Sequence, residues 1–296
     1  MRVFVTGAAG FIGTETTKEL IANGHQVIGL ARSEANVETL RKLGAEVHRG
    51  SLQDLESLKS GARNSDGVIH LAFIHDFTKF AENGAIDKTA IEAMGDVLAG
   101  TNKPFIVTSG TGLIAPGVVV TEEMRRESSP HVPRVSEQAG LAYASRGVRA
   151  MAIRLPQVHG EPGKAGLISY LVELARQKGA AAYVGEGTER WAAAHRQDVA
   201  RLYRLALEKG AADGIYHAVG EEGVPMRQVI ELIGRALNIP VVSIAQERAG
   251  DYYGPLARFA GLDMPASSAL TQQRLGWTPT GIGLIADIGQ PGYFRA

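Results

Sequence analysis

A glycine-rich segment near the start of the chain has the residue types and spacing to bind an anion. Residues 5–13 read VTGAAGFIG and join a short apolar run to a predicted helix. We expect Gly7 to permit a tight turn, Gly10 to let backbone approach a pyrophosphate, and Gly13 to bring the helix close to the sheet. Unpaired N–H groups at a helix start, with the helix dipole behind them, form an anion site. A turn without a ligand is the alternative, and the flanking strand and helix favour the nucleotide site.

The end of the second predicted strand indicates which dinucleotide would bind. It reads GLARS over residues 29–33, with no carboxylate where dinucleotide-binding folds place the acid that contacts the adenosine ribose. Arg32 and the hydroxyl of Ser33 could bind a ribose 2′-phosphate, which a carboxylate would repel. The sequence therefore predicts NADP(H) over NAD(H). An ordinary solvent-exposed arginine is the alternative.

The elements that must position these residues alternate between strands and helices. Short, mostly apolar runs predict strands at residues 3–5, 25–30, 45–48, 67–71, 104–108 and 148–155. Amphipathic patterns predict helices at 14–23, 34–43, 52–61, 77–100 and 134–146. Apolar strands that alternate with helices indicate a parallel sheet covered on both faces. We predict an α/β fold with a Rossmann-type doubly wound parallel sheet.

After residue 155 the regular alternation ends. Prolines and glycines between 156 and 166 mark a loop, and further elements are predicted at 166–178, 182–184, 195–208, 215–219 and 225–237. We expect 1–155 to form the dinucleotide-binding domain and 156–296 to form mostly a smaller, interleaved C-terminal substrate lobe. Residues 190–220 are expected to return to the first domain.

Composition narrows the function classes. The 296 residues carry 31 basic and 31 acidic side chains, so no net charge attracts nucleic acid or an anionic membrane. Cysteine is absent, no apolar run has the length of a membrane span, and the first residues do not read as a secretion leader. Neither a zinc-helix histidine spacing nor a Gly-x-Ser-x-Gly elbow occurs. We expect a cytoplasmic protein without a metal, a nucleic acid partner or a membrane partner.

Further motifs follow the predicted strands. They are Gly50-Ser51-Leu52, His70-Leu71-Ala72, Val107-Thr108-Ser109, Arg154-Leu155-Pro156, and His195 followed by Asp198-Val199-Ala200. With the glycine-rich turn, they make the chain resemble the short-chain dehydrogenase/reductase superfamily, in its extended or atypical branch of the NAD-dependent epimerase/dehydratase type. The resemblance implies an oxidoreductase with a small-molecule substrate. Related proteins often pair through helices equivalent to 78–100 and 134–146, which implies a homodimer.

The resemblance also implies the cofactor contacts. Ser51 and Leu52 would lie by the adenine, although the family more often has Asp at the position of Ser51, and Pro156 to Val158 would lie near the nicotinamide. The full predicted set is Gly7, Ala9, Gly10, Phe11, Ile12, Gly13, Arg32, Ser33, Ser51, Leu52, Leu71, Ala72, Phe73, Thr108, Pro156 and Val158.

The candidate catalytic residues match the family pattern only in part. By resemblance, Ser109 occupies the position of the serine or threonine that orients the substrate carbonyl; capping the turn before Gly110 is its alternative role. The family's Tyr-x-x-x-Lys pair, in which lysine lowers the tyrosine pKa for proton exchange, is absent, because residues 129–134 contain neither residue type. His75 and His131 are the candidate proton donors in its place, and an ordinary structural histidine is the alternative at each.

Three residues are predicted to contact the substrate. By resemblance, Arg190 would bind a phosphate or carboxylate group, and His159 takes the place of a family tyrosine close to the pocket floor. Trp191 could stack on a planar substrate or pack between the lobes. Asp198 is expected to anchor its helix and to take no part in the chemistry.

The residues are compatible with three functions. The first is an NADPH-dependent oxidoreductase that reduces a small carbonyl or related compound, with chemistry supplied mainly by the cofactor. The second is a non-catalytic NADP(H)-binding sensor, which the missing Tyr and Lys would permit. A nucleotide-sugar epimerase or dehydratase ranks last, because those reactions generally need the tyrosine and recycle NAD.

Overall fold

The computed structural model describes residues 1–112, 114–125, 134–162 and 166–294. Its largest element is a parallel seven-stranded sheet of order β10-β6-β5-β4-β1-β2-β3. The strands are β1 (Arg2–Thr6), β2 (Gln26–Ala31), β3 (Glu46–Arg49), β4 (Gly67–His70), β5 (Pro104–Gly110), β6 (Arg149–Leu155) and β10 (Gly214–His217). The strand order reverses between β1 and β4, which is the point where doubly wound sheets form their ligand crevice.

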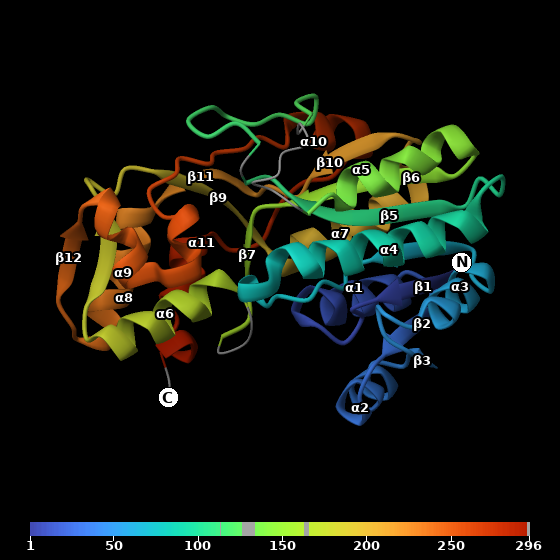
Figure 1. The fold of residues 1–296 in the computed structure, drawn as a ribbon, viewed down its shortest axis with the longest axis horizontal. Helices are drawn as coiled ribbons and strands as arrows, with labels where there is room; N and C mark the ends of the chain where they lie inside the picture. The colour runs from blue at the N-terminus through green and yellow to red at the C-terminus, as the bar shows by residue number, and fades with distance from the viewer. Residues whose placement is uncertain (113, 126–133, 163–165, 295–296) are drawn as a thin grey trace.

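Helices cover both faces of this sheet (Figure 1). One face carries α1 (Phe11–Ala22), α2 (Glu34–Lys42) and α7 (Arg196–Lys209), and the other carries α3 (Leu55–Arg63), α4 (Phe80–Leu98) and α5 (Ser136–Leu141). Except in the edge strand β3, most strand side chains are therefore buried on both faces, in line with their largely apolar composition. The predicted Rossmann-type fold is confirmed.

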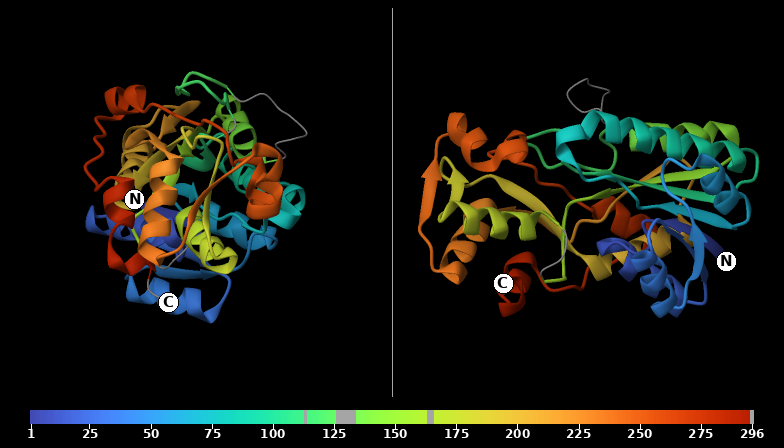
Figure 2. Two further views of the ribbon diagram at one scale, coloured as in Figure 1. Left: turned by 90° about the vertical axis from the view of Figure 1, so that its left-hand side faces the viewer. Right: turned by 60° about the horizontal axis from the view of Figure 1, so that its bottom comes forward.

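A second lobe, with its own apolar core, lies beside the sheet along the long axis of the molecule (Figures 1 and 2). Its strands are β7 (Gln157–His159), β8 (Ala181–Val184), β9 (Arg190–His195), β11 (Glu221–Pro225) and β12 (Val241–Ile244). They form a three-stranded sheet, β11-β9-β7, and a two-stranded sheet, β12-β8. Its helices are α6 (Leu167–Lys178), α8 (Met226–Leu237), α9 (Ala249–Tyr253) and α11 (Leu284–Ile288), while α10 (Ala269–Leu275) packs on β10 and α7.

The chain crosses between the two parts more than once. After β9, α7 packs against α1 and β10 joins the edge of the seven-stranded sheet, before β11 and α8 return to the second lobe. Residues 196–217 thus lie with the first domain. Short 3₁₀ turns complete the chain, namely η1 (Phe77–Lys79), η2 (Ala142–Arg146), η3 (Gln246–Arg248), η4 (Gly254–Arg258) and η5 (Pro291–Phe294).

Two predicted helices differ in the structure. The helix expected over 134–146 begins at Ser136, ends at Leu141 and continues as η2, because Gly147 adopts a left-handed conformation that ends it. The helix expected from residue 195 is preceded by β9, which the sequence did not reveal. Across the described ranges, no helix combines the length and apolar character needed to cross a bilayer.

Candidate functional site

A cavity of about 970 Å³ opens at the carboxyl ends of the parallel strands, between the sheet and the second lobe. Its volume is in the range of sites that hold a cofactor or a drug-sized ligand. The predicted cofactor contacts that line it are Gly7, Ala9, Gly10, Phe11, Ile12, Gly13, Arg32, Ser51, Leu52, Leu71, Ala72, Phe73, Thr108, Pro156 and Val158. The cavity also contains Ser109, His75 and Trp191 from the other predicted sets.

The glycine-rich turn brings the start of α1 to the cavity wall. Gly7 has φ +70°, and a Cβ there would lie 2.8 Å from the backbone nitrogen of Ala72. A Cβ at Gly13 would lie only 1.9 Å from the carbonyl oxygen of Gly7, so the helix packs directly on the turn. No side chain caps α1 at Gly10, which leaves its first N–H groups available to an anion.

One end of the cavity is basic. Arg32 lines it beside Asn36, Ser51 and Gln53, and no hydrogen bond or ion pair joins its guanidinium to the described part of the chain. The carboxylate of Glu34, two residues later, is held by Arg49 at 2.6 and 3.0 Å.

Ser33 does not line the cavity. Its hydroxyl accepts a hydrogen bond from the backbone N–H of Asn36 at 3.3 Å and caps α2. The predicted phosphate contact at this position is therefore replaced by a structural one.

The other end of the cavity contains the predicted reaction groups. Ser109, at the end of β5, is 7% exposed, and among the described residues its hydroxyl has no hydrogen-bond partner. His75 follows β4 at the exposed rim, with its ring edge-on to Phe73 at 5.2 Å. Desolvation by surrounding atoms and the positive charge of Arg134 lower the pKa of His75 below its usual value, so the ring is neutral at pH 7.

Arg134 is a cavity residue that the sequence analysis did not single out. Its Nε donates to the hydroxyl of Ser136 at 2.8 Å and its Nη2 donates to the carbonyl oxygen of Thr108 at 2.9 Å. The guanidinium also stacks on the ring of Phe73, 3.9 Å from its centroid. Arg134 is the last residue of the segment 129–134, which lacks the Tyr-x-x-x-Lys pair, and a cation in that atypical segment is the sequence signal that points to it.

A buried chain of hydrogen bonds supports Arg134 from below. Ser136 donates to Asp87 at 2.5 Å, and Asp87 contacts His70 Nε2 at 3.1 Å. His70 Nδ1 in turn lies 2.8 Å from the hydroxyl of Thr6. Burial opposes ionisation of Asp87, but His70, Arg134 and Ser136 outweigh it and lower the pKa of its carboxyl. The carboxylate is thus fixed one side chain away from the cavity.

The other predicted substrate contacts lie outside the cavity. Arg190 is bound by Asp263, with Nη2 to Oδ2 at 2.7 Å, and His159 is buried with Nδ1 2.9 Å from Asp287 Oδ2. Both side chains are bound by carboxylates far away in the sequence, and neither lines the cavity. Asp198 accepts the backbone N–H groups of Thr280 and Gly281, which agrees with a structural role. His131 lies outside the described residues.

The second lobe supplies an apolar wall. Trp191 is 8% exposed, and its indole N–H donates to the carbonyl oxygen of Leu262 at 3.0 Å. The other wall residues from this lobe are Leu167, Tyr170, Ala192, Leu256, Phe259 and Met264. Apart from the hydroxyl of Tyr170, this side of the cavity offers a ligand mainly carbon surface.

The charges that line the cavity have one sign. Arg32 and Arg134 are its cationic side chains, and no Asp or Glu lines it among the residues that the structure describes. Within the same residues, no group of three or more histidines and carboxylates could hold a metal ion. The electrostatic environment therefore favours anionic ligands at two places.

A doubly wound sheet with a glycine-rich β1–α1 turn facing a cavity defines a Rossmann-type α/β protein. The model of the NAD dependent epimerase/dehydratase family matches residues 3–219. The chain belongs to this family, and so to the extended short-chain dehydrogenase/reductase superfamily.

Related proteins and structures agree with this assignment. The chain is 46% identical over 296 residues to an uncharacterized protein of Schizosaccharomyces pombe, covering 99% of this chain and 100% of that protein. It is 28% identical to a decarboxylating sterol-4-alpha-carboxylate 3-dehydrogenase of Dictyostelium discoideum, covering 76% of this chain and 73% of the relative. In fold it is similar to a dTDP-glucose 4,6-dehydratase of Streptomyces venezuelae, with a TM-score of 0.79, 20% identity and coverage of 98% and 95%.

Proposed function

We propose that the protein is an NADPH-dependent oxidoreductase that reduces a small carbonyl compound. The observation that carries the proposal is one continuous cavity, with the glycine-rich turn and Arg32 toward one end and Ser109 and His75 at the other. The Dictyostelium relative is named as a dehydrogenase, which supports a hydride-transfer reaction on this scaffold.

The residues present fit a phosphorylated dinucleotide. The unpaired N–H groups at the start of α1 suit a pyrophosphate, and Gly7 and Gly10 leave no side chain between it and the backbone. Arg32 suits a 2′-phosphate, since the nearby Glu34 carboxylate is already paired with Arg49. A bound nicotinamide supplies the hydride.

The protein residues would orient the substrate and manage the proton. The hydroxyl of Ser109 donates a hydrogen bond to the substrate carbonyl oxygen. This hydrogen bond polarises the carbonyl and fixes which of its faces is turned toward the cofactor. His75, when protonated, gives a proton to the alcohol oxygen that forms. The apolar wall of the second lobe excludes water from the reacting atoms.

Replacing Ser109 with alanine tests the reaction. Removing the only hydroxyl proposed to bind the carbonyl is expected to lower kcat/KM about 10- to 100-fold, with NADPH affinity unchanged. The assay measures substrate-dependent NADPH oxidation across aldehydes, ketones and imines, with product identification and NADH in parallel. Ser145→Ala, an exposed serine on η2, is the matched control. Full activity in Ser109→Ala would remove the serine from the mechanism.

Replacing Arg32 with serine tests the cofactor assignment. The loss of a charge-assisted contact to the 2′-phosphate is expected to weaken NADPH binding by about 10- to 100-fold and NADH binding by less than about threefold. Isothermal titration calorimetry with both cofactors measures the change. Arg41→Ser, on the exposed end of α2, controls for the loss of a surface charge. Equal loss of affinity for both cofactors would contradict a 2′-phosphate contact.

The pH dependence tests His75. Because its pKa lies below 6.5, the protonated donor becomes scarcer as the pH rises above that value. With an uncharged ketone, we expect log kcat/KM to fall by about one per pH unit between roughly pH 7 and 8.5. His75→Gln should give a lower, flat profile. An unchanged slope in that variant would assign proton delivery to another group.

A non-catalytic NADP(H) sensor is the second candidate. It is favoured by the absence of the Tyr-x-x-x-Lys pair from residues 129–134. A sensor would bind NADP⁺ and NADPH with different affinities and produce no reduced product from any compound in the panel. Any specific product would exclude it.

A further inference from the structure

Arg134 is the only cation of the described residues at the reaction end of the cavity, and no described carboxylate is its direct counter-ion. No ion pair connects its guanidinium to a described carboxylate, because Ser136 lies between it and Asp87. Partly burying a guanidinium without a counter-ion is costly, and desolvation lowers the pKa of Arg134 although it remains protonated at neutral pH. An anionic ligand beside the guanidinium would offset this desolvation cost.

The orientation of the guanidinium leaves one edge for a ligand. The edge formed by Nε and Nη2 is held by Ser136 and by the carbonyl oxygen of Thr108, while the ring of Phe73 covers one face. Nη1 makes no hydrogen bond with the residues that the structure describes. The edge formed by Nη1 and Nη2 therefore presents two parallel donors, which match the two oxygens of a carboxylate.

This edge lies close to the group that is proposed to orient the carbonyl. Arg134 is bonded to the backbone oxygen of Thr108, the residue directly before Ser109. A ligand that contacts both side chains must carry its acid group within a few bonds of its carbonyl.

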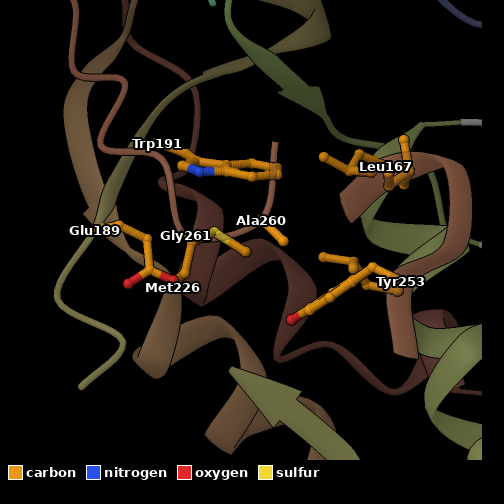
Figure 3. A pocket seen from close by; sticks show the side chains of 9 residues that line it. Leu167, Glu189, Trp191, Met226, Tyr253, Ala260 and Gly261 are labelled. Atoms are coloured by element: carbon orange, nitrogen blue, oxygen red, sulfur yellow. The ribbon is translucent and has the colours of Figure 1, made fainter. Parts of the chain in front are cut away.

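The cavity wall that the second lobe supplies is apolar. The indole N–H of Trp191 is already bound to Leu262, so the ring offers a ligand only carbon atoms. Behind Trp191 lies a side space between its ring and the side chains of Met226 and Tyr253 (Figure 3), with a volume of about 10 Å³. That volume holds about one water molecule, so the substrate body must end at Trp191 and Leu256.

We propose that the substrate is an amphipathic oxo acid, whose carboxylate binds Arg134, whose carbonyl lies at Ser109 and whose apolar body packs on Trp191. The substrate class rests on the proposed reductase function, while the acid subsite at Arg134 does not require turnover. The combination of a single half-buried pair of parallel donors and an apolar wall selects such a molecule over a neutral ketone or a sugar nucleotide.

Binding without turnover tests the acid subsite. Isothermal titration calorimetry would compare hydrocinnamate with hydrocinnamide, which differ only in the acid group, on the NADP⁺-saturated protein. We expect the acid to bind about 10- to 100-fold more tightly in the wild type. Arg134→Gln should reduce this preference to less than about threefold while amide binding persists, and Arg134→Lys should keep part of it. Arg41→Gln is the control for a lost surface charge.

Turnover then tests the substrate class. Benzoylacetate is expected to have a kcat/KM for NADPH oxidation at least about tenfold above that of its methyl ester, through KM, and Arg134→Gln should remove the difference. Equal binding of the acid and the amide by the wild type would overturn the inference, whether or not Arg134→Gln folds. An equal fall of kcat for acid and ester in Arg134→Gln would also overturn it, because the arginine would then act on the carbonyl oxygen. Acid-selective binding without any turnover would retain the subsite and refute the reductase.

Discussion

Replacing Glu137 with alanine is expected to lower the free energy of unfolding by about 3–5 kcal/mol, because it leaves the buried charge of Arg154 without its partner. The two side chains form a two-point ion pair, with Nε–Oε2 at 2.7 Å and Nη2–Oε1 at 2.6 Å, and Arg154 is 0% exposed. His217 Nε2 also lies 3.2 Å from Arg154, but burial lowers the pKa of His217 to about 4, so this ring supplies no charge.

Urea unfolding followed by circular dichroism measures this loss, with the denaturant slope checked for a constant value. Glu38→Ala is the matched control, since it breaks an ion pair whose Lys42 and Glu38 side chains are 72% and 68% exposed. That change is expected to cost less than about 0.5 kcal/mol. A loss of under about 1 kcal/mol for Glu137→Ala would mean that water or another group compensates Arg154. Glu137→Gln, which keeps the shape and one acceptor, should lie between the two.

The central sheet could be predicted because each strand carries its own signal. Residues 3–5, 67–71 and 104–108 are mostly apolar runs, and burial on both faces favours that composition. The carboxyl ends of parallel strands meet at one edge of a sheet. The residues that follow those strands, such as Ser51, Ala72 and Ser109, were therefore expected together and do line one cavity.

The second lobe could not be predicted in the same way. β9 reads RWAAAH and β7 is only three residues long, so neither shows a period that separates a strand from a loop or a helix. Both are strands because they pair with each other and β9 also pairs with β11, and that pairing is tertiary.

Partners far away in the sequence explain why two predicted substrate contacts do not line the cavity. Arg190 meets Asp263, 73 positions away, and His159 meets Asp287, 128 positions away. No local pattern shows that these polar side chains are already paired and so withdrawn from the cavity. Arg134, in contrast, lines the cavity without having been predicted to do so. Only the three-dimensional path of the chain after β5 brings its guanidinium beside Thr108 and Phe73.

The close packing of α1 on the β1–α1 turn contributes to the stability of the fold and to the proposed cofactor site. Gly13→Ala is therefore expected to lower both stability and NADPH affinity. A Cβ at Gly13 would lie 1.9 Å from the oxygen of Gly7 and 2.8 Å from the Cα of Ala8, and both are backbone atoms that no rotamer change can move. Forcing α1 away from the turn should cost about 3 kcal/mol. Alanine's better helix propensity returns only about 1 kcal/mol of this.

The same displacement moves the N–H groups at the start of α1 away from the cavity. We therefore expect Gly13→Ala to lower the free energy of unfolding by roughly 2 kcal/mol and to weaken NADPH binding by more than about tenfold. Gly250→Ala in α9 is the control, because a Cβ there meets no atom within 4 Å and its φ is not positive, so it should be neutral or slightly stabilising. Urea unfolding and calorimetry on both variants separate the two effects. If Gly13→Ala binds NADPH normally, the start of α1 does not form the pyrophosphate site.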